Sequence, residues 1–404
     1  MLKNPDFHTA REVLLRTVEP VAAEAVALAC CGGRVLAEDL SAAENVPAFD
    51  RSPYDGYAFR SADTAVASKT APVTLRVIEE VPAGAVPTRA CTEGAAVKLL
   101  TGAPIPEGAD AVVKYEATEF TAHTVRIFSP ARPGENIIRT GEDVRQGDIL
   151  VRRGQRIDPG AAGTLAAQGF SHVRVYRVPR VGIISTGDEV VEAGEERSPG
   201  KIYNSNRFTL AAALEALGCE AVYLGLAGDS VSGICHLLKQ GLLECDAVVA
   251  TGGVSAGDYD RTPEAMELAG VRLLFRGVDI KPGMACAYGE KDGRLVCGLS
   301  GNPASALTNF YVLAAPALKK LAGLAGVIPE LFPVRLNNGF RKGSPHTRLL
   351  RGKLTLSGGT AGMLLPPDQG NVVLSSAIGC DVIAIVPAGS GPLDAGTVLD
   401  GFLL

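Results

Sequence analysis

The sequence contains no tryptophan, no long run of basic residues and no apolar run of membrane-spanning length. A spanning helix needs about 20 apolar residues, so we expect none in this chain. The formal net charge is −5, so an anionic substrate must be held by local groups rather than by the overall charge. These absences argue against a membrane or a nucleic acid as a partner.

The cysteines show none of the spacings that are typical of a metal site or a disulfide framework. The nine cysteines include no C-x-x-C pair, and the five histidines are scattered. We therefore expect small buried thiols in a reducing compartment, and no zinc or iron–sulfur site. The first residues, Met1 to Asp6, do not resemble a signal peptide, so the expected location is the cytoplasm.

A dinucleotide-binding fingerprint is also absent, because no G-x-G-x-x-G follows a strand-like run. This argues against a dinucleotide-dependent oxidoreductase. The chain does contain 47% hydrophobic residues, which is enough for packed cores. Its 404 residues predict two to four domains.

Between residues 180 and 321, strand-like apolar runs alternate with helical patterns. The expected strands span 180–185, 221–226, 246–250 and 295–299, and the expected helices span 206–217, 231–243, 261–269 and 303–321. This repetition predicts a mostly parallel sheet with helices on both faces.

Short strands between Gly and Pro turns flank this α/β region. Residues 72–113 are expected to form several of them, after a helix at 8–18. Beyond residue 329, strands are expected at 333–336, 348–356, 372–374 and 382–386. We expect a β-rich part before the α/β region and a small β-barrel or sandwich after it.

Polar groups gather where the predicted parallel strands end. Three such motifs each follow a predicted strand: Thr186-Gly-Asp-Glu189, Gly228-Asp229 and Ser300-Gly-Asn-Pro303. A fourth stretch, residues 250–260 with the sequence A-T-G-G-V-S-A-G-D-Y-D, also follows a predicted strand. Ligands bind at the carboxyl ends of the strands in such sheets, so we expect a site at this edge.

The stretch 250–260 has the features of a phosphate loop. Gly252 and Gly253 lack a Cβ, so the backbone N–H groups can approach a phosphate closely. Asp258 and Asp260 add negative charge, which is consistent with a divalent cation between the carboxylates and the phosphates. The alternative is a plain strand-to-helix turn with capping aspartates.

Eight motifs occur in one order along nearly the whole chain. They are Ser52-Pro-Tyr-Asp-Gly-Tyr-Ala58, the loop 101–110, Arg139-Thr-Gly-Glu-Asp143, Thr186-Gly-Asp-Glu189, Gly228-Asp229, Thr251-Gly-Gly-Val-Ser255 with Asp260, Lys281-Pro-Gly283 and Ser300-Gly-Asn-Pro303. Together they resemble the molybdopterin molybdenumtransferase family, which includes the gephyrin E-domain. One such motif alone would be a weak signal, whereas eight in order are specific.

The resemblance implies a multidomain fold, α/β plus β. Its four domains would be an elongated domain from 1–25 and 140–177, a β-rich domain at 26–139, an α/β molybdopterin-binding domain at 178–326 and a C-terminal β-barrel at 327–404. The resemblance also implies a homodimer with a shared site. Asp55, Thr101 and Asp143 of one subunit would then reach the site of the other.

The activity that the resemblance implies is a transferase reaction. Molybdate is inserted into adenylylated molybdopterin, with Mg²⁺-dependent release of AMP. The implied partners are these two substrates, a second copy of the chain and the adenylyltransferase of the same pathway. The implied catalytic residues are Glu189, Asp229 and Asp260, and the last two would hold Mg²⁺.

The remaining site residues implied by the resemblance bind substrate. They are Asp55, Thr101, Arg139, Asp143, Thr186, Gly252, Gly253, Ser255, Lys281, Ser300, Asn302, Pro303 and Arg348. Within this set, Lys281, Ser300 and Arg348 are expected to hold molybdate, an oxyanion that needs cationic and N–H donors.

The sequence departs from the family pattern near this anion site. Met284-Ala285 stand where a Lys or Arg and a Pro are usual, and Asn371 stands where a serine is usual. Gly277 replaces a second lysine, although Arg276 is adjacent. These changes predict weakened molybdate binding. Two alternatives to an active enzyme are a molybdopterin-binding or scaffolding paralogue without turnover, and a molybdopterin adenylyltransferase.

Overall fold

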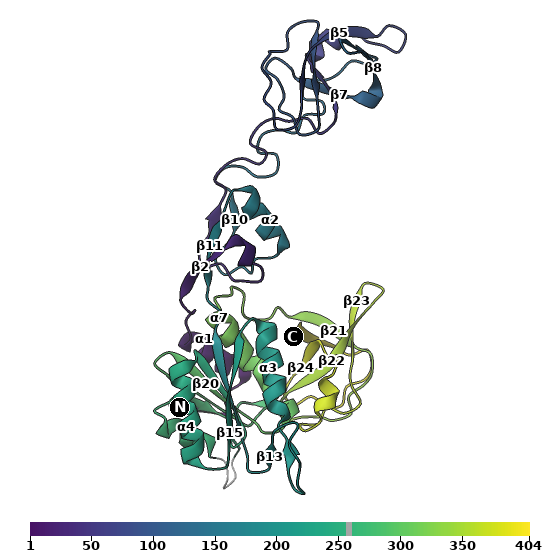
Figure 1. The fold of residues 1–404 in the computed structure, drawn as a ribbon. Helices are drawn as coiled ribbons and strands as arrows, with labels where there is room; N and C mark the ends of the chain where they lie inside the picture. The colour runs from purple at the N-terminus through teal and green to yellow at the C-terminus, as the bar shows by residue number, and fades with distance from the viewer. Residues whose placement is uncertain (256–260) are drawn as a thin grey trace. The chain divides into compact units, whose positions relative to one another are not determined.

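The computed structural model describes residues 1–255 and 261–404, and the chain separates into two compact units (Figure 1). Unit 1 comprises Met1–Glu38, Arg153–Asp158 and His172–Leu404, and unit 2 comprises Asp39–Arg152 and Pro159–Ser171. In the part of the chain that the structure describes, no helix is both long and apolar enough to cross a membrane. The division into four domains stays a prediction.

A seven-stranded sheet forms the centre of unit 1, in the order β1-β17-β19-β20-β16-β12-β15. Its strands are β1 (Leu2–Lys3), β12 (Arg180–Thr186), β15 (Glu220–Ala227), β16 (Ala247–Thr251), β17 (Arg272–Arg276), β19 (Cys286–Lys291) and β20 (Arg294–Leu299). Only β19 runs against its neighbours β17 and β20; the other described pairings in this sheet are parallel. The prediction of a mostly parallel sheet is confirmed.

Helices cover both faces of this sheet, as predicted. The helices are α1 (Phe7–Thr17), α3 (Ser205–Leu217), α6 (Pro303–Asn309) and α7 (Ala315–Leu321) on one face, and α4 (Val231–Glu244) and α5 (Thr262–Leu268) on the other. The alternation of side chains along β16 explains the two layers, because Val249 joins the first core and Val248 the second. Figure 1 shows α3 and α7 on the opposite side of the strands from α4.

The predicted helix 303–321 contains one irregularity. A π-helical turn, Phe310–Ala314, lies between α6 and α7, and all three segments follow one another without a break.

Unit 1 also contains two small two-stranded sheets. In one, β13 (Val190–Val191) pairs with β14 (Ile202–Tyr203) next to α3, and in the other β2 (Ala23–Ala27) pairs with β11 (His172–Tyr176).

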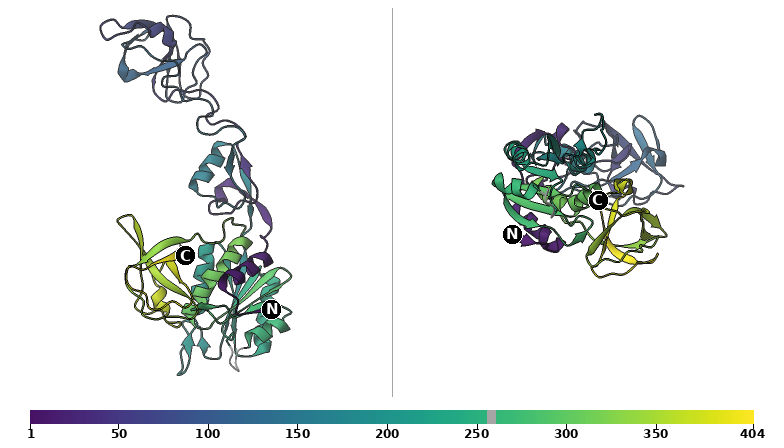
Figure 2. Two further views of the ribbon diagram at one scale, coloured as in Figure 1. Left: turned by 180° about the vertical axis from the view of Figure 1, so that it is seen from behind. Right: turned by 90° about the horizontal axis from the view of Figure 1, so that it is seen from below.

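The C-terminal part of unit 1 is a closed β-barrel, as predicted. Its strands are β21 (Phe332–Leu336), β22 (Thr347–Ser357), β23 (Thr360–Leu364), β24 (Val382–Val386) and β25 (Val398–Leu403), and β22 closes the ring by pairing with both β23 and β24. Leu349, Ile383 and Phe402 belong to the buried cluster of the α/β part, so the barrel shares its core. Figure 2 shows the barrel, in yellow, beside the sheet.

The strand expected at 372–374 is wrong. Val372 is 64% exposed, and the backbone of this segment bonds locally, with Val373 N–H donating to Gly370 O and Leu374 N–H to Val372 O. A short 3₁₀-helix, Leu374–Ala377, follows. The apolar run had strand-like composition, but its backbone groups are satisfied within turns rather than in a ladder.

Unit 2 is built on a six-stranded sheet in the order β7-β4-β6-β5-β9-β8. These strands are β4 (Gly56–Phe59), β5 (Val73–Val81), β6 (Ala95–Leu99), β7 (Ala111–Lys114), β8 (Thr118–Phe120) and β9 (Thr124–Ile127). The unit also contains β3 (Leu40–Ser41) paired with β10 (Ile149–Val151), and α2 (Pro159–Ala167). The β-rich character expected here is confirmed, and the chain as a whole is a multidomain α/β plus β protein.

Candidate active site

The loops that follow β20, β16, β12 and β15 lie at one edge of the sheet, because these four strands are parallel neighbours in that order. The sequence predicted this arrangement. Residues 256–260, which include the predicted metal ligand Asp260 and its neighbour Asp258, lie outside the described residues.

The turn after β16 requires glycine for a reason that the sequence did not reveal. Gly252 has φ +101°, and a Cβ there would lie 2.4 Å from Thr186 Oγ1. At Gly253, with φ +61°, a Cβ would lie 2.9 Å from Thr262 Oγ1. The Thr186 hydroxyl donates to Thr251 O at 3.0 Å, so the glycines allow β12 and β16 to pack tightly at the site.

A cavity of about 490 Å³ opens above these strand ends. Many of its lining groups are hydroxyls and amides: Ser185, Thr186, Asn204, Ser205, Asn206, Thr251, Ser255, Ser300 and Asn302, with Glu189, Gly253 and Pro303 among the others. Seven predicted site residues, from Thr186 to Pro303, are thus brought together. The cavity also meets the N-terminus of α3 at Ser205, where the helix dipole favours an anion.

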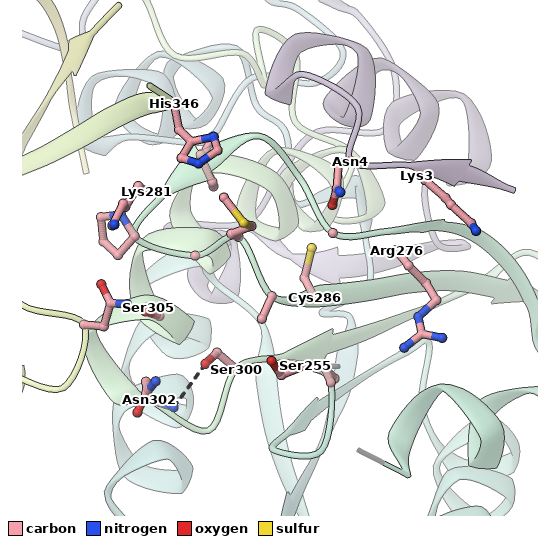
Figure 3. A pocket seen from close by; sticks show the side chains of 18 of the residues that line it. Lys3, Asn4, Ser255, Arg276, Lys281, Cys286, Ser300, Asn302, Ser305 and His346 are labelled. Carbon is pink, nitrogen blue, oxygen red and sulfur yellow. Dashed lines mark hydrogen bonds between the residues drawn. The ribbon is translucent and has the colours of Figure 1, made fainter. Parts of the chain in front are cut away.

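A larger cavity of about 870 Å³ adjoins the first (Figure 3). The two share Val254, Ser255, Ser300 and Asn302 as lining residues. The larger one also contains Lys3, Arg276, Lys281 and His346. Its walls therefore carry basic groups, whereas the smaller cavity carries neutral polar groups and the acidic Glu189. Lys281 and Ser300 were predicted, whereas Lys3, Asn4 and His346 were not.

A hydrogen bond between Ser300 and Asn302 lies in the wall between the two cavities. Asn302 N–H donates to Ser300 Oγ at 3.2 Å, and Ser300 itself is only 8% exposed (Figure 3). Asn302 is the N-cap residue of α6, but its side chain makes no capping hydrogen bond to the described residues. The amide of Asn302 is therefore available to a ligand.

Lys281 reaches the larger cavity through an outlying strand of the barrel sheet. β18 (Ile280–Lys281) pairs in parallel with β22, which places Lys281 beside Arg348. The Arg348 guanidinium lies 5.0 Å from the centre of the Phe340 ring, and burial lowers its pKa. Arg348 is not among the described residues that line either cavity, so its contact with molybdate stays a prediction.

Cys286 also lines the larger cavity, but its thiol has low reactivity. Burial raises the pKa of this thiol to about 12, so it stays protonated at neutral pH and is a poor nucleophile and metal ligand. His346 Nδ1 lies 2.5 Å from Asp279 Oδ1, which orients the imidazole at the cavity wall. The nine cysteines are all free; seven are buried as expected, whereas Cys380 is half-buried and Cys30 is exposed.

Asp229 lies beside an aspartate that the sequence analysis passed over. Asp188 N–H is 3.4 Å from Asp229 Oδ2, and Asp229 N–H is 3.2 Å from Asp188 Oδ1. Each carboxylate thus accepts from the backbone N–H of the other aspartate, at the ends of β12 and β15. Asp188 precedes the predicted Glu189 in the same motif, and strand pairing rather than sequence spacing selects it as the partner of Asp229.

A half-buried acidic group, Glu192, holds residues that line the smaller cavity. Glu192 accepts from Tyr223 Oη at 2.5 Å, from Asn204 Nδ2 at 2.9 Å and from Arg207 Nη1 at 2.8 Å. Burial raises the pKa of Glu192, but these three donors outweigh it and lower the pKa overall. Asn204 Oδ1 in turn accepts from Ser185 Oγ at 3.1 Å, so the network fixes two lining residues.

Comparisons with known proteins agree with this picture. Residues 6–169 match the family described as MoeA N-terminal region (domain I and II), and residues 182–320 match the one described as probable molybdopterin binding domain. The molybdopterin molybdenumtransferase of Staphylococcus aureus (strain N315) is 38% identical over 380 residues, which cover 93% of this chain and 90% of the relative. The chain belongs to the molybdopterin molybdenumtransferase family.

Other known proteins are similar over the same length. The molybdopterin molybdenumtransferase of Staphylococcus epidermidis is 36% identical over 92% of this chain and 88% of its own. The crystal structure of the molybdopterin biosynthesis moeA protein from Pyrococcus horikoshii OT3 has a TM-score of 0.85 and 32% identity, over 99% of this chain and 100% of that one. A molybdenum cofactor biosynthesis protein from Pyrococcus furiosus, with a TM-score of 0.61 and 20% identity, shares the fold.

The departures from the family pattern gather in one place. Gly277, Met284, Ala285 and Asn371 all line the larger cavity. The sequence could not show that these separated positions face the same space. The larger cavity therefore combines these departures with the motif residues Lys281 and Ser300.

Unit 2 holds the other predicted residues. Asp55 Oδ1 accepts from both the N–H and the hydroxyl of Thr101, each at 2.7 Å, and the hydroxyl bond followed by the N–H bond lowers the pKa of Asp55. Arg139 Nη1 donates to Asp50 Oδ2 at 2.6 Å, a partner that sequence reasoning missed. Asp143 is exposed, and its N–H donates to Val46 O.

Proposed function

We propose that this protein inserts molybdate into adenylylated molybdopterin and releases AMP, producing the molybdenum cofactor. The observation that carries the proposal is the pair of adjoining cavities with Ser255, Ser300 and Asn302 in their common wall. One cavity offers neutral donors and a helix N-terminus, and the other offers cations. A substrate with a pyrophosphate and a second, free oxyanion needs both kinds of site side by side.

The smaller cavity suits the phosphates of the adenylylated substrate. Ser255 and Asn302 can donate to phosphate oxygens, with the positive end of the α3 dipole behind them, while Thr186, whose hydroxyl donates to Thr251 O, forms part of the wall. Gly252 and Gly253 form the turn that brings Ser255 to this position. Pro303 starts the helix at the cavity wall and leaves no N–H unsatisfied there.

The larger cavity suits molybdate. Lys281 and Arg276 supply cations, and Ser300 supplies a hydroxyl in the common wall. An oxyanion held by such charge-assisted bonds lies next to the phosphates. In the reaction, a water oxygen attacks the phosphorus of molybdopterin, the P–O bond to AMP breaks and AMP leaves; the two dithiolene sulfurs then bind molybdenum, and one molybdate oxygen leaves with their protons as water.

The donor set at the strand ends fits Mg²⁺. Among the described residues no group of three His, Cys, Asp or Glu side chains is placed to hold a metal. Asp188 and Asp229 nevertheless present two carboxylates together, and Mg²⁺ is held by one or two carboxylates plus substrate phosphates. We assign Asp188, Asp229 and Asp260 as its ligands and Glu189 as a neighbouring acidic group; bound Mg²⁺ would neutralise charge on the phosphates.

We further propose that the protein acts as a homodimer, in which Asp55, Thr101, Arg139 and Asp143 of one subunit serve the substrate bound by the other. The rigid, ionised Asp55 suits a hydrogen bond from a pterin N–H group. The adenylyltransferase of the same pathway would deliver the substrate. The nine free thiols suit the reducing cytoplasm.

The test is AMP release by the purified full-length protein from adenylylated molybdopterin, with molybdate and Mg²⁺ varied separately. We expect release to need both. Binding of the substrate without release would instead indicate a scaffolding paralogue. Consumption of ATP with unadenylylated molybdopterin would indicate an adenylyltransferase.

A further inference from the structure

The N-terminal strand β1 borders the larger cavity, although it is far in sequence from the other lining residues. β1 pairs in parallel with β17, with Lys3 beside Arg276. Met1, Lys3 and Asn4 line the cavity together with Arg276 and Gly277. Figure 3 shows Lys3 and Arg276 on neighbouring strands at one end of the hollow, with Lys281 and His346 at the other.

Hydrogen bonds of the residues just after Lys3 hold this segment in place. Asn4 N–H donates to Arg276 O at 3.0 Å, and Asp279 N–H donates to Pro5 O at 2.9 Å. Asp6 then caps α1, accepting from Thr9 N–H at 3.0 Å. The backbone at Lys3 is therefore tied to β17 and to the first helix.

The segment fits the cavity because residue 277 is glycine. The Asn4 side chain fills the space beside it, since a Cβ on Gly277 would lie 1.8 Å from Asn4 Oδ1. Gly277 also has φ +68°, a conformation that favours glycine. Glycine at 277 thus removes one side chain from the wall and admits the strand that carries Lys3.

Three cations of this cavity have no side-chain partner among the described residues. Within the described part of the chain, no hydrogen bond or ion pair is made by the side chains of Lys3, Arg276 or Lys281. Like charges facing one hollow repel each other unless an anion lies between them. The arrangement therefore favours a bound anion at the end where Lys3 and Arg276 lie together.

We propose that Lys3 and Arg276 form an oxyanion-binding pair at this end of the cavity, with the N-terminal strand supplying a cation where residue 277 supplies none. The inference rests on the proposed function for the identity of the ligand. A tetrahedral oxyanion is the chemistry that two adjacent cations recognise, and it comes either from free molybdate or from a phosphate of the adenylylated substrate.

The experiment compares Lys3→Gln and Arg276→Gln with wild type, using the full-length protein. Lys239→Gln is the matched control, because Lys239 is an exposed lysine on α4 and lines neither of these two cavities. One arm measures the molybdate concentration that half-saturates AMP release. The other measures the Kd for adenylylated molybdopterin without molybdate, and molybdate binding alone is followed by calorimetry.

We expect Lys3→Gln and Arg276→Gln each to raise one of these two constants about tenfold. Lys3→Arg should keep that constant near its wild-type value, and Lys239→Gln should leave both constants unchanged. A shift in the molybdate constant identifies free molybdate as the ligand, and a shift in the substrate Kd identifies a phosphate. Wild-type constants in Lys3→Gln and Arg276→Gln would overturn the inference. A wild-type protein that binds molybdate but releases no AMP would overturn the proposed function instead, while the calorimetry would still test Lys3.

Discussion

The side chain of Asn4 occupies the place of the side chain that Gly277 lacks. An ideal Cβ on Gly277 would lie 1.8 Å from Asn4 Oδ1. Asn4 has φ +43° and Gly277 φ +68°, so both residues adopt the left-handed conformation that asparagine and glycine tolerate best. The two positions are therefore coupled across 273 residues of sequence.

The first prediction tests this coupling. Gly277→Ala should lower the melting temperature, because overpacking and the left-handed φ each cost roughly 1–2 kcal/mol. In an Asn4→Gly background the same substitution should cost only about 1 kcal/mol, since the clash is gone. Thermal unfolding of the wild type, the two single variants and the double variant measures the difference. Equal losses in both backgrounds would show that the two side chains do not compete.

The second prediction concerns the acidic group beneath the smaller cavity. The folded-state pKa of Glu192 is lowered, so its contribution to stability is present above the ordinary value of 4.5 and is lost as pH falls through the lowered pKa. Glu192→Gln should therefore cost about 1–2 kcal/mol at pH 7 and less at pH 3.5, which lies below the ordinary value of 4.5. Urea unfolding at both pH values measures this. A cost that does not change with pH would contradict the assigned ionisation.

The third prediction concerns Mg²⁺. Asp188→Asn and Asp229→Asn should each raise the half-saturating Mg²⁺ concentration for AMP release about tenfold or more, because a charged ligand contributes roughly 1.5–3 kcal/mol. The melting temperature should be unchanged or higher, since an asparagine Oδ1 can still accept the backbone N–H bond while the repulsion between carboxylates disappears.

Asp394→Asn is the matched control for these two variants. Asp394 is 85% exposed and pairs with Arg341 in the barrel. It should leave the Mg²⁺ requirement unchanged. If Asp188→Asn or Asp229→Asn lost much stability and kept a normal Mg²⁺ requirement, these aspartates would serve the fold rather than the metal.

The parts of the fold that the sequence predicted are those with a local pattern. The helix expected at 206–217 is Ser205–Leu217, and the one expected at 231–243 is Val231–Glu244. Their spacing, caps and flanking apolar strands are all read within about 15 residues. Once the strands are parallel, the meeting of their carboxyl ends follows from topology, so the position of the site was predictable.

The parts that the sequence missed depend on contacts between distant segments. β1 has two residues, too few for any periodicity, and it exists because β17 offers an open edge. Asp188 was passed over for Glu189 because only the pairing of β12 with β15 shows which of the two approaches Asp229. Lys3 and His346 reach the larger cavity from opposite ends of the chain, and no spacing connects them.

The fourth prediction tests the proposed dimer. If Asp55 serves the partner's substrate, mixing Asp55→Ala subunits with Asp229→Ala subunits should recover part of the activity that each variant lacks. One site of each mixed dimer would then contain both wild-type residues. Activity of the mixture after subunit exchange, compared with each variant alone, measures the recovery. No recovery, with exchange demonstrated, would mean that one subunit supplies both residues.

The last prediction concerns Met284, which lines the larger cavity and is 36% exposed. Met284→Lys adds a cation to that cavity, and one charge-assisted bond of about 1.5 kcal/mol corresponds to roughly tenfold in affinity. If Lys3 already serves the oxyanion, the gain should be small in wild type and close to tenfold in the Lys3→Gln background. Met284→Gln controls for the change of shape. The measurement is the half-saturating molybdate concentration of four proteins: the wild type, Met284→Lys, Lys3→Gln and the double variant. A Met284→Lys variant that leaves this concentration unchanged in both backgrounds would place molybdate away from residue 284 and remove the case for a weakened site.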